Sequence, residues 1–291
     1  MNNKLNNMIN EFLANTDAKN EDELNEQLQK FIKKYNAGEV YYTNTILDDA
    51  YELLEKAENT KSKRQAIKYA KEAYEMCPDC FDELLFQVHL ADNPLKRMKL
   101  LDEGLEFEKD RLLEEKYFDK DNIGHFYGIF ETRPYIRGLY AKADYLILDG
   151  KIKKARDICK EILKLNENDN IGARYLLMAI YAYLEEENDM LELYKKYPEE
   201  DLEMLFPLFI LYYKQENDKK AKEYLDRIDK ANPHFINFFK GTMEENNDIP
   251  YRYYAKGDSS EVIMYFKEYD FLVNTIPTID CYILENSKKK K

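Results

Sequence analysis

The residues whose types could do chemistry gather in one short segment, where His125, Tyr127, Glu131 and Arg133 lie within nine positions. A histidine beside a glutamate can act as a general base that the carboxylate orients. This arrangement suggests an enzyme, or a receptor for a small ligand, with a pocket near residues 125–137. Against catalysis, no serine or cysteine nucleophile stands in a diagnostic motif, and the GHFYG segment is too short for a phosphate-binding loop.

The same segment also has a purely structural interpretation. GHFYG can pack as an irregular connector, with Thr132 as the N-cap of a helix and Pro134 in the first turn, where a missing N–H costs little. The sequence leaves open whether the segment is a binding site or a packing connector, and we predict no catalytic residue.

The four cysteines do not form a recognisable metal site. Cys77 and Cys80 make one CxxC motif, Cys159 and Cys281 stand alone, and the three histidines are scattered. A structural zinc site needs four ligands, and no second CxxC motif supplies the other two. We therefore expect the CPDC segment to be a turn between helices, and we predict neither a metal nor any other cofactor.

The charge balance argues against nucleic acid as a partner. The chain has 44 basic and 57 acidic residues, a net charge of −13, and its only dense basic run is 288–291. A net acidic chain repels phosphate backbones. The longest nearly apolar run, 202–213, has 12 residues and contains Glu203, whereas a membrane span needs about 20. We expect a buried helix there, no membrane partner and, because residues 1–10 contain no apolar signal segment, a cytoplasmic location.

The elements that must position these residues are helices. The chain has only 9 glycines and 8 prolines in 291 residues, while 44% of its residues are hydrophobic and 14% aromatic. A β-sandwich or barrel needs many turns rich in glycine and proline, and a disordered chain would have far fewer aromatic residues. The composition therefore predicts an all-α protein.

Three windows of the chain repeat a pattern of two short amphipathic helices, with apolar residues at i, i+3, i+4 and i+7. One small residue in each second helix fixes the register, and these residues are Ala66, Ala155 and Ala221. A small residue is needed there because the paired helices approach closely. Pro78 and Pro233 follow the first and the third alanine by 12 residues each. This register is the tetratricopeptide pattern of about 34 residues.

We expect one domain over 1–291, an all-α solenoid of stacked antiparallel helix pairs of the tetratricopeptide type. Residues 1–40 form a helical cap, 41–234 the repeats and 235–291 the capping helices at the other end. Between the second and third windows, 170–201 is a shortened repeat without the small residue. Stacked pairs bury a continuous core, and the caps keep the terminal apolar faces from water.

Four segments are more specific than a generic helical repeat. They read GHFYG at 124–128, ETRPYIR at 131–137, LNENDNIGARY at 165–175 and YRYYAKGDSSEVIMYF at 251–266. With these motifs the chain resembles a family of bacterial tetratricopeptide repeat proteins that is related to the suppressor-of-tumorigenicity 7 proteins of animals. That family has a tryptophan where this chain has Tyr127 and a proline where it has Glu167.

The resemblance implies a repeat scaffold with no established chemistry. The animal relatives have membrane segments that this chain lacks. We therefore predict a protein that is not an enzyme and that binds a protein or peptide partner on the concave face of its solenoid.

Counting along the repeats places six residues at the predicted binding face. In this repeat class the first helix of each pair lines the concave face, and five of the residues come from these helices. The sixth is an asparagine at a repeat boundary. The six are Arg137, Tyr140, Asn170, Arg174, Tyr181 and Phe206. The two arginines come from adjacent repeats, and a planar guanidinium binds carboxylate in a bidentate way. We expect this pair to anchor an acidic side chain or C-terminal carboxylate of the partner, while the aromatic residues hold its apolar groups.

Two alternatives stay open on this face. The arginines can instead pair internally with Asp144 or Glu131, which is plausible in so acidic a chain. Asp169 or Asn170 can serve only as the N-cap of a helix over 171–184, because both residue types are favoured at that position.

Overall fold

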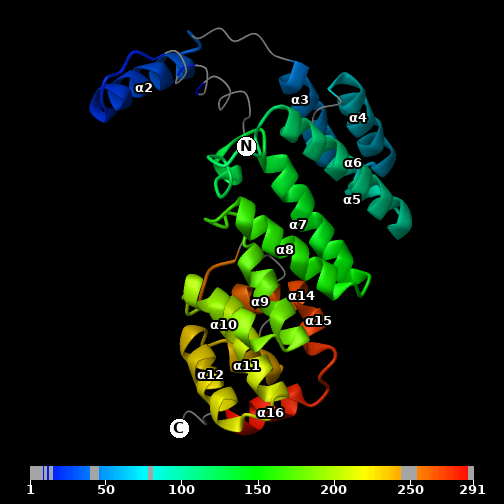
Figure 1. The fold of residues 1–291 in the computed structure, drawn as a ribbon, viewed down its shortest axis with the longest axis vertical. Helices are drawn as coiled ribbons and strands as arrows, with labels where there is room; N and C mark the ends of the chain where they lie inside the picture. The colour runs from blue at the N-terminus through cyan, green and yellow to red at the C-terminus, as the bar shows by residue number, and fades with distance from the viewer. Residues whose placement is uncertain are drawn as a thin grey trace. The chain divides into compact units, whose positions relative to one another are not determined.

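A computed structural model of the chain describes residues 16–39, 46–77, 81–243 and 254–287, together with Ile9 and Phe12. Every regular element in these residues is a helix, and extended pairing is limited to isolated bridges between 124–125 and Asn166 (Figure 1). The predicted all-α class is therefore confirmed. The chain divides into two compact units, Met1–Asp110 and Arg111–Lys291, which we describe separately.

The first unit contains helices α2 to α5 and most of α6. Their bounds are α2 Glu21–Asn36, α3 Ile46–Asn59, α4 Lys63–Met76, α5 Phe81–Leu90 and α6 Pro94–Glu114. Helices α3 and α4 pack against each other over a core that includes Ala50, Leu54, Ala70 and Ala73. Asn20 caps α2, because its side chain accepts a hydrogen bond of 2.9 Å from the N–H of Glu23.

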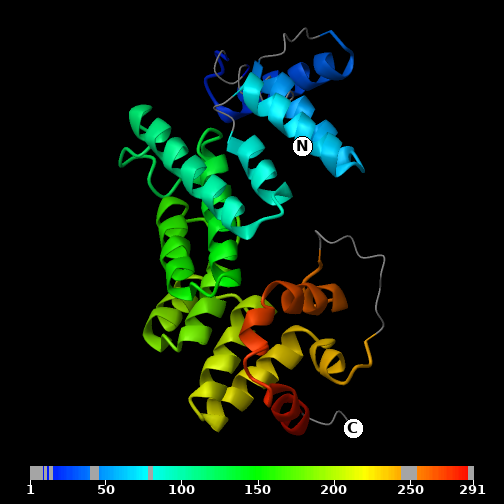
Figure 2. The same cartoon turned by 90° about the vertical axis from the view of Figure 1, so that its right-hand side faces the viewer.

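The second unit contains three helix pairs followed by shorter helices. The pairs are α7 Arg133–Leu148 with α8 Ile152–Leu165, α9 Ala173–Leu184 with α10 Glu187–Lys196, and α11 Leu202–Lys214 with α12 Asp218–Ala231. A short 3-10 helix, η1 Phe126–Gly128, precedes them. The shorter helices are α13 Phe235–Phe239, α14 Ser259–Glu268, α15 Asp270–Val273 and α16 Ile279–Asn286. The chain turns back through them, so that α14 packs on α11 and α15 on α9 (Figure 2).

The small residues that set the predicted register lie where helices pack. Ala66, Ala155 and Ala221 fall in α4, α8 and α12, the second helix of their pairs, and each is buried. Pro233 follows the end of α12, whereas Pro78 lies outside the described residues. The predicted segment 170–201 also forms a pair, α9 with α10, in which Met190 and Leu193 are the buried residues of the second helix.

The apolar run of 202–213 forms a buried helix, as predicted. From Leu202 to Tyr212 every residue of α11 is buried, including Glu203 and a proline in the helix interior, Pro207. Among the described residues, no helix is both long enough and apolar enough to cross a membrane.

Several expectations fall on parts of the chain outside the described residues. These include the basic run 288–291, most of the first expected helix in 1–40, the start of the motif at 251–266, and Cys80 of the CPDC segment. The expectation that CPDC binds no metal therefore stays a prediction, as does the single domain over 1–291.

Candidate functional site

The GHFYG segment is a packing connector that is tied to the LNENDN segment. The carbonyl of Gly124 accepts a hydrogen bond of 2.8 Å from the N–H of Glu167. Phe126 is fully buried and meets the ring of Phe118 at a centroid distance of 5.0 Å. Gly124 has a φ of +95°, a backbone conformation that favours glycine. A Cβ at this position would also lie only 3.2 Å from the side chain of Glu167. Two of the motifs behind the family resemblance therefore form one structural unit.

The side chains expected around a pocket near residues 125–137 do not join into a catalytic pair. His125 and Glu131 are exposed, and no hydrogen bond joins them. The Nε of Arg133 donates to the carbonyl of Tyr127 at 2.8 Å, so this arginine holds the connector to α7. None of His125, Tyr127, Glu131 and Arg133 lines either of the two cavities described below.

Thr132 stands at the N-cap position of α7, as predicted, but it does not act through its side chain as a cap. Its buried hydroxyl donates to the carbonyls of Phe126 and, at 3.2 Å, Ile129. The hydroxyl therefore binds the preceding connector rather than the orphan N–H groups of the helix.

The first N–H groups of α9 are bonded by Asp169. Its two carboxylate oxygens accept hydrogen bonds from the N–H groups of Ala173 at 2.7 Å and Arg174 at 2.9 Å. The helix begins at Ala173 rather than at residue 171, so Gly172, and neither Asp169 nor Asn170, occupies the N-cap position. Asp169 bonds the first N–H groups of the helix from three residues before that position. Asn170 is exposed beside the cavity described below.

Arg174 belongs to a cluster of five charged residues. We call this set the paired cluster, and it consists of Asp169, Arg174, Glu199, Asp201 and Lys256. The Arg174 guanidinium lies 2.8 Å from the Asp169 carboxylate and 2.9 Å from that of Glu199. Lys256 Nζ lies 2.6 Å from Asp201 and 3.2 Å from Glu199.

The paired cluster leaves Arg174 no charge to offer an acidic partner group. The alternative of internal pairing is therefore correct for Arg174, but with Asp169 and Glu199 in place of Asp144 and Glu131. Burial acts to raise the pKa of Glu199, but hydrogen bonds from Tyr175 and Asp201 and the charge of Arg174 outweigh it and lower that pKa to about 2. Glu199 is thus a firmly ionised member of the cluster.

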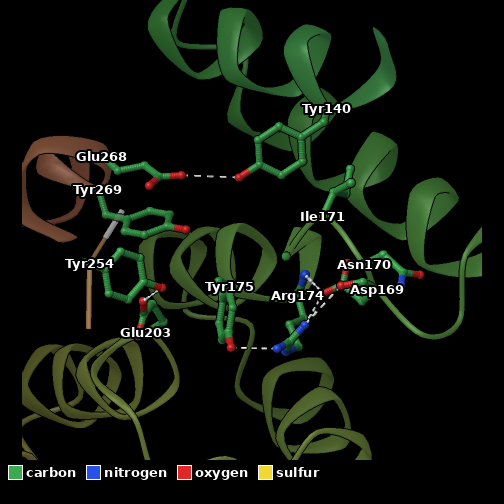
Figure 3. Close-up of a pocket in the computed structure, with 11 residues that line it drawn as sticks. Tyr140, Asp169, Asn170, Ile171, Arg174, Tyr175, Glu203, Tyr254, Glu268 and Tyr269 are labelled. Carbon is green, nitrogen blue, oxygen red and sulfur yellow. Dashed lines mark hydrogen bonds and ion pairs between the residues drawn. The ribbon is translucent and has the colours of Figure 1, made fainter. Parts of the chain in front are cut away.

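A cavity of about 340 Å³ lies beside the paired cluster (Figure 3). Its lining comes from α7, from the start of α9 with the loop before it, from α11, and from the segment that leads into and out of α14. Four tyrosines and two glutamates dominate this lining, and they are Tyr140, Tyr175, Tyr254, Tyr269, Glu203 and Glu268. We call this space the tyrosine cavity.

The two glutamates of the tyrosine cavity lack cationic partners. The hydroxyl of Tyr254 donates to Glu203 Oε1, but Glu203 Oε2 is buried and has no hydrogen-bond donor. The hydroxyl of Tyr140 points from α7 toward Glu268 on α14 and donates to its carboxyl at 3.4 Å (Figure 3). The ion pairs between described residues include neither glutamate.

Burial without a cation raises the pKa values of these carboxyls. For Glu203, burial and the nearby carboxylates of Asp201 and Glu261 raise the pKa to about 7, although the Tyr254 hydrogen bond opposes the change. Asp144 lies one turn after Tyr140 on α7, and burial together with Glu268 raises its pKa to about 7.

Glu268 keeps access to water from the cavity, yet the protein atoms around its carboxyl still raise its pKa. Carboxyl groups with displaced pKa values in a cleft are characteristic of functional sites.

Two of the predicted binding residues are buried, so the prediction was wrong for them. Tyr181 is only 3% exposed, and Phe206 is completely buried. Phe206 packs against Tyr265 and Phe266 of α14 at ring-centroid distances of 5.4 and 5.2 Å. The physical reason is that α14 returns onto the face of α11 that the repeat register leaves open.

Of the six predicted binding residues, Tyr140, Asn170 and Arg174 do line the tyrosine cavity. Arg137 is half-buried and does not line it. Sequence reasoning missed Glu268, Tyr254 and Tyr269, whereas counting along the repeats from Leu202 does place Glu203 at a groove-facing position. One signal was present, because Glu203 interrupts an apolar run and a carboxylate there must be buried.

A second cavity, of about 400 Å³, lies at the far end of α11. Tyr213, Lys214, Asp218 and Tyr282 contribute to its lining. Two of its charged groups are paired, because Lys214 lies 3.0 Å from Glu185 and Asp218 lies 2.6 Å from Lys222. It therefore offers a contrast to the tyrosine cavity.

No protein-family model matches this sequence, and no curated protein matches it either.

Proposed function

We propose that the protein is a non-catalytic scaffold that binds a protein or peptide partner, and that the partner contacts the tyrosine cavity. The observation that carries this proposal is the cavity itself, which is large enough for one side chain with part of its backbone and is lined by four tyrosines. Tyrosine supplies a large contact area and a polar hydroxyl at a small cost in conformational entropy, which makes it common in binding sites.

The proposal includes the architecture of the scaffold. The helix pairs with buried alanines at their closest approach support a tetratricopeptide solenoid, and the returning helices α13 to α16 would be its cap. Membership of the bacterial family named above is part of the same proposal, and it rests on the sequence motifs. The thiols of Cys159 and Cys281, which form no disulfide among the described residues, suit a reducing compartment and support a cytoplasmic location.

We do not expect the partner to bind through an acidic group held by an arginine of this protein. Because the Arg174 guanidinium forms ion pairs with both Asp169 and Glu199, its charge is already compensated, and the bidentate recognition of an acidic group that the sequence suggested is not favoured there. The proposed contact is therefore with the tyrosines and carboxyls of the cavity instead.

The proposal can be tested by selecting peptides from a random displayed library against the full chain. The expected result is a set of peptides whose binding falls at least tenfold in the Tyr140→Ala variant, measured by fluorescence anisotropy of a labelled copy. Tyr282→Ala is the matched control, because Tyr282 is also half-buried, lines the other cavity and donates to a carboxylate, that of Asp218.

Two results would overturn the proposal. Selection could yield no peptide above background, or the selected peptides could lose the same affinity in both variants. Either result would mean that the tyrosine cavity does not receive a partner chain.

A further inference from the structure

The charges around the tyrosine cavity are out of balance. Among the described residues that line it, the only cation is Arg174, whose charge is already shared between Asp169 and Glu199. Glu203 and Glu268 line the same space and have only tyrosine hydroxyls as hydrogen-bond donors from side chains. Uncompensated carboxylates leave this cavity with a negative potential, and the net charge of −13 over the whole chain adds to it.

Glu203 gives the clearest sign that something is missing. The residue is 4% exposed, it lines the cavity, and its Oε2 atom has no hydrogen-bond partner. A buried carboxylate without a partner is costly, and folded proteins rarely keep one unless it has a role. A cation in the cavity would supply the charge that Glu203 lacks.

The aromatic lining suits the same ligand. The face of a tyrosine ring attracts a cation, and cages of aromatic residues are used to recognise alkylated or free ammonium groups. The ring of Tyr175 is already covered by Arg174, whose guanidinium carbon lies 4.0 Å from the ring centroid. Tyr140, Tyr254 and Tyr269 line the cavity without such a cation over the ring, in the part of the chain that the structure describes.

We infer that the tyrosine cavity binds a positively charged side chain, the ammonium of a lysine or the guanidinium of an arginine, presented by the partner. This inference rests on the proposed function and specifies the chemistry of its site. Glu268, which water can reach from the cavity, makes the direct contact with the cation. Glu203, which is buried, supplies a second negative charge. The three tyrosines surround the cation and its aliphatic stem.

Binding of a cation depends on ionised carboxyls, so it depends on pH. The groups that face Glu203 are the carboxyls of Asp201 and Glu261 and the hydroxyls of Tyr254, Tyr265 and Tyr269. The groups that face Glu268 are Tyr140 and Asp144 from α7 and Tyr269 next to α14. Burial of both groups and the carboxyls near Glu203 disfavour ionisation, whereas the hydrogen bonds from Tyr254 to Glu203 and from Tyr140 and Tyr269 to Glu268 favour it. A bound cation would favour the ionised form further. Affinity should therefore rise as pH increases through about 7, where Glu203 loses its proton.

The experiment uses three probes and the full chain. The probes are Nα-acetyl-lysine methylamide, its uncharged norleucine counterpart and its glutamate counterpart, and binding is followed by NMR chemical-shift changes of the protein at pH 8. We expect the lysine probe to bind at least tenfold more tightly than the other two. Adding 1,5-diaminopentane shows whether a free diamine competes as well as the peptide-like lysine, which distinguishes a free amine ligand from a side chain.

Two variants and a matched control locate the binding. Glu268→Gln and Glu203→Gln should each weaken the lysine probe about tenfold. Glu223→Gln removes the same charge from an exposed position on α12 and should leave the affinity unchanged. Equal binding of the norleucine probe, tighter binding of the glutamate probe, or an equal loss in the control would overturn the inference.

The outcomes also separate this inference from the proposed function. If selected peptides occupy the cavity but their binding ignores a lysine-to-norleucine change, the scaffold function stands and the cation inference falls. If the lysine probe binds but no peptide is ever selected, the cation site stands and the partner-chain function falls.

Discussion

Two groups of carboxyls lie side by side in the second unit, and Glu199 of the first and Glu203 of the second differ from their ordinary pKa in opposite directions. In the paired cluster, Glu199 is held by Arg174 and Lys256 at 2.9 and 3.2 Å. In the tyrosine cavity, Glu203 and Glu268 accept hydrogen bonds from tyrosine hydroxyls, and no cation of the described part of the chain pairs with them. The pKa of Glu199 falls to about 2, whereas that of Glu203 rises to about 7.

The difference indicates that the carboxyls of the paired cluster stabilise the fold, whereas those of the tyrosine cavity bind a ligand. A buried ion pair with its hydrogen bonds complete contributes to the uniqueness of the fold, and removing one partner is costly. A buried carboxyl without a cation lowers stability in the free protein, so its presence is better explained by a ligand. This argument leads to a set of mutations with effects of opposite sign.

The largest effect is expected from Arg174→Ala, which breaks the paired cluster. The Arg174 side chain is 14% exposed, and its loss leaves the buried Asp169 without its cation and Glu199 with Lys256 alone. We expect the free energy of unfolding to fall by about 3–5 kcal/mol in chemical denaturation at pH 7. Arg174→Lys keeps the charge but not the planar guanidinium, so its free energy of unfolding should lie between those of the wild type and Arg174→Ala. A fully stable Arg174→Ala protein would show that the cluster is not structural.

Glu203→Gln should change stability in the opposite direction. The pKa of Glu203 is raised from 4.5 to about 7 in the folded state, so the folded protein binds more protons than the unfolded chain between these values. Wild-type stability is therefore lost as pH rises from about 4.5 to 7, and the glutamine variant escapes this loss.

We expect Glu203→Gln to be more stable than wild type by roughly 2–3 kcal/mol at pH 8 and about equal at pH 4, from denaturation at both pH values. A variant that is less stable at pH 8 would contradict the contrast between the two groups. Because the variant should be stable, any loss of cation binding in it cannot be ascribed to unfolding.

A substitution on α12 tests the comparison through the partner helix α11, which carries Glu203. Ala221 is completely buried in the α11–α12 pair, and Ala221→Leu should overpack that pair at a cost of about 1–3 kcal/mol. Ala155→Leu makes the same change in the α7–α8 pair and serves as its counterpart. Unchanged thermal midpoints in both variants would refute the repeat register, and NMR signals of Glu203 should shift more in the first variant than in the second.

The smallest effect is expected from Tyr140→Phe. The Tyr140 hydroxyl donates to Glu268 at 3.4 Å and works to lower the pKa of that carboxyl. Without the hydroxyl, the pKa of Glu268 should rise further in an NMR titration, while stability changes by less than about 1 kcal/mol. A lower pKa in the variant would mean that the two groups do not interact as the cavity geometry indicates.

The sequence by itself determined the helices and their pairing. Apolar periodicity, the small residues at Ala155 and Ala221, and capping residues such as Asn20 and Asp258 act over a few neighbouring positions, so they can be interpreted without the fold. The burial of the run 202–213 was also predictable, since twelve nearly apolar residues have no other stable place in a protein of this composition.

Only the tertiary structure decided which residues form the site. The bond from Tyr254 to Glu203 spans 51 positions and the contact of Lys256 with Asp201 spans 55, and both exist because the segment before α14 returns to α11. The same return buries Phe206, which repeat counting had placed on an open face. Local patterns determine which face of a helix is apolar, but they do not say which later helix will cover it. The charge that each carboxyl meets therefore depends on contacts that no short-range pattern contains.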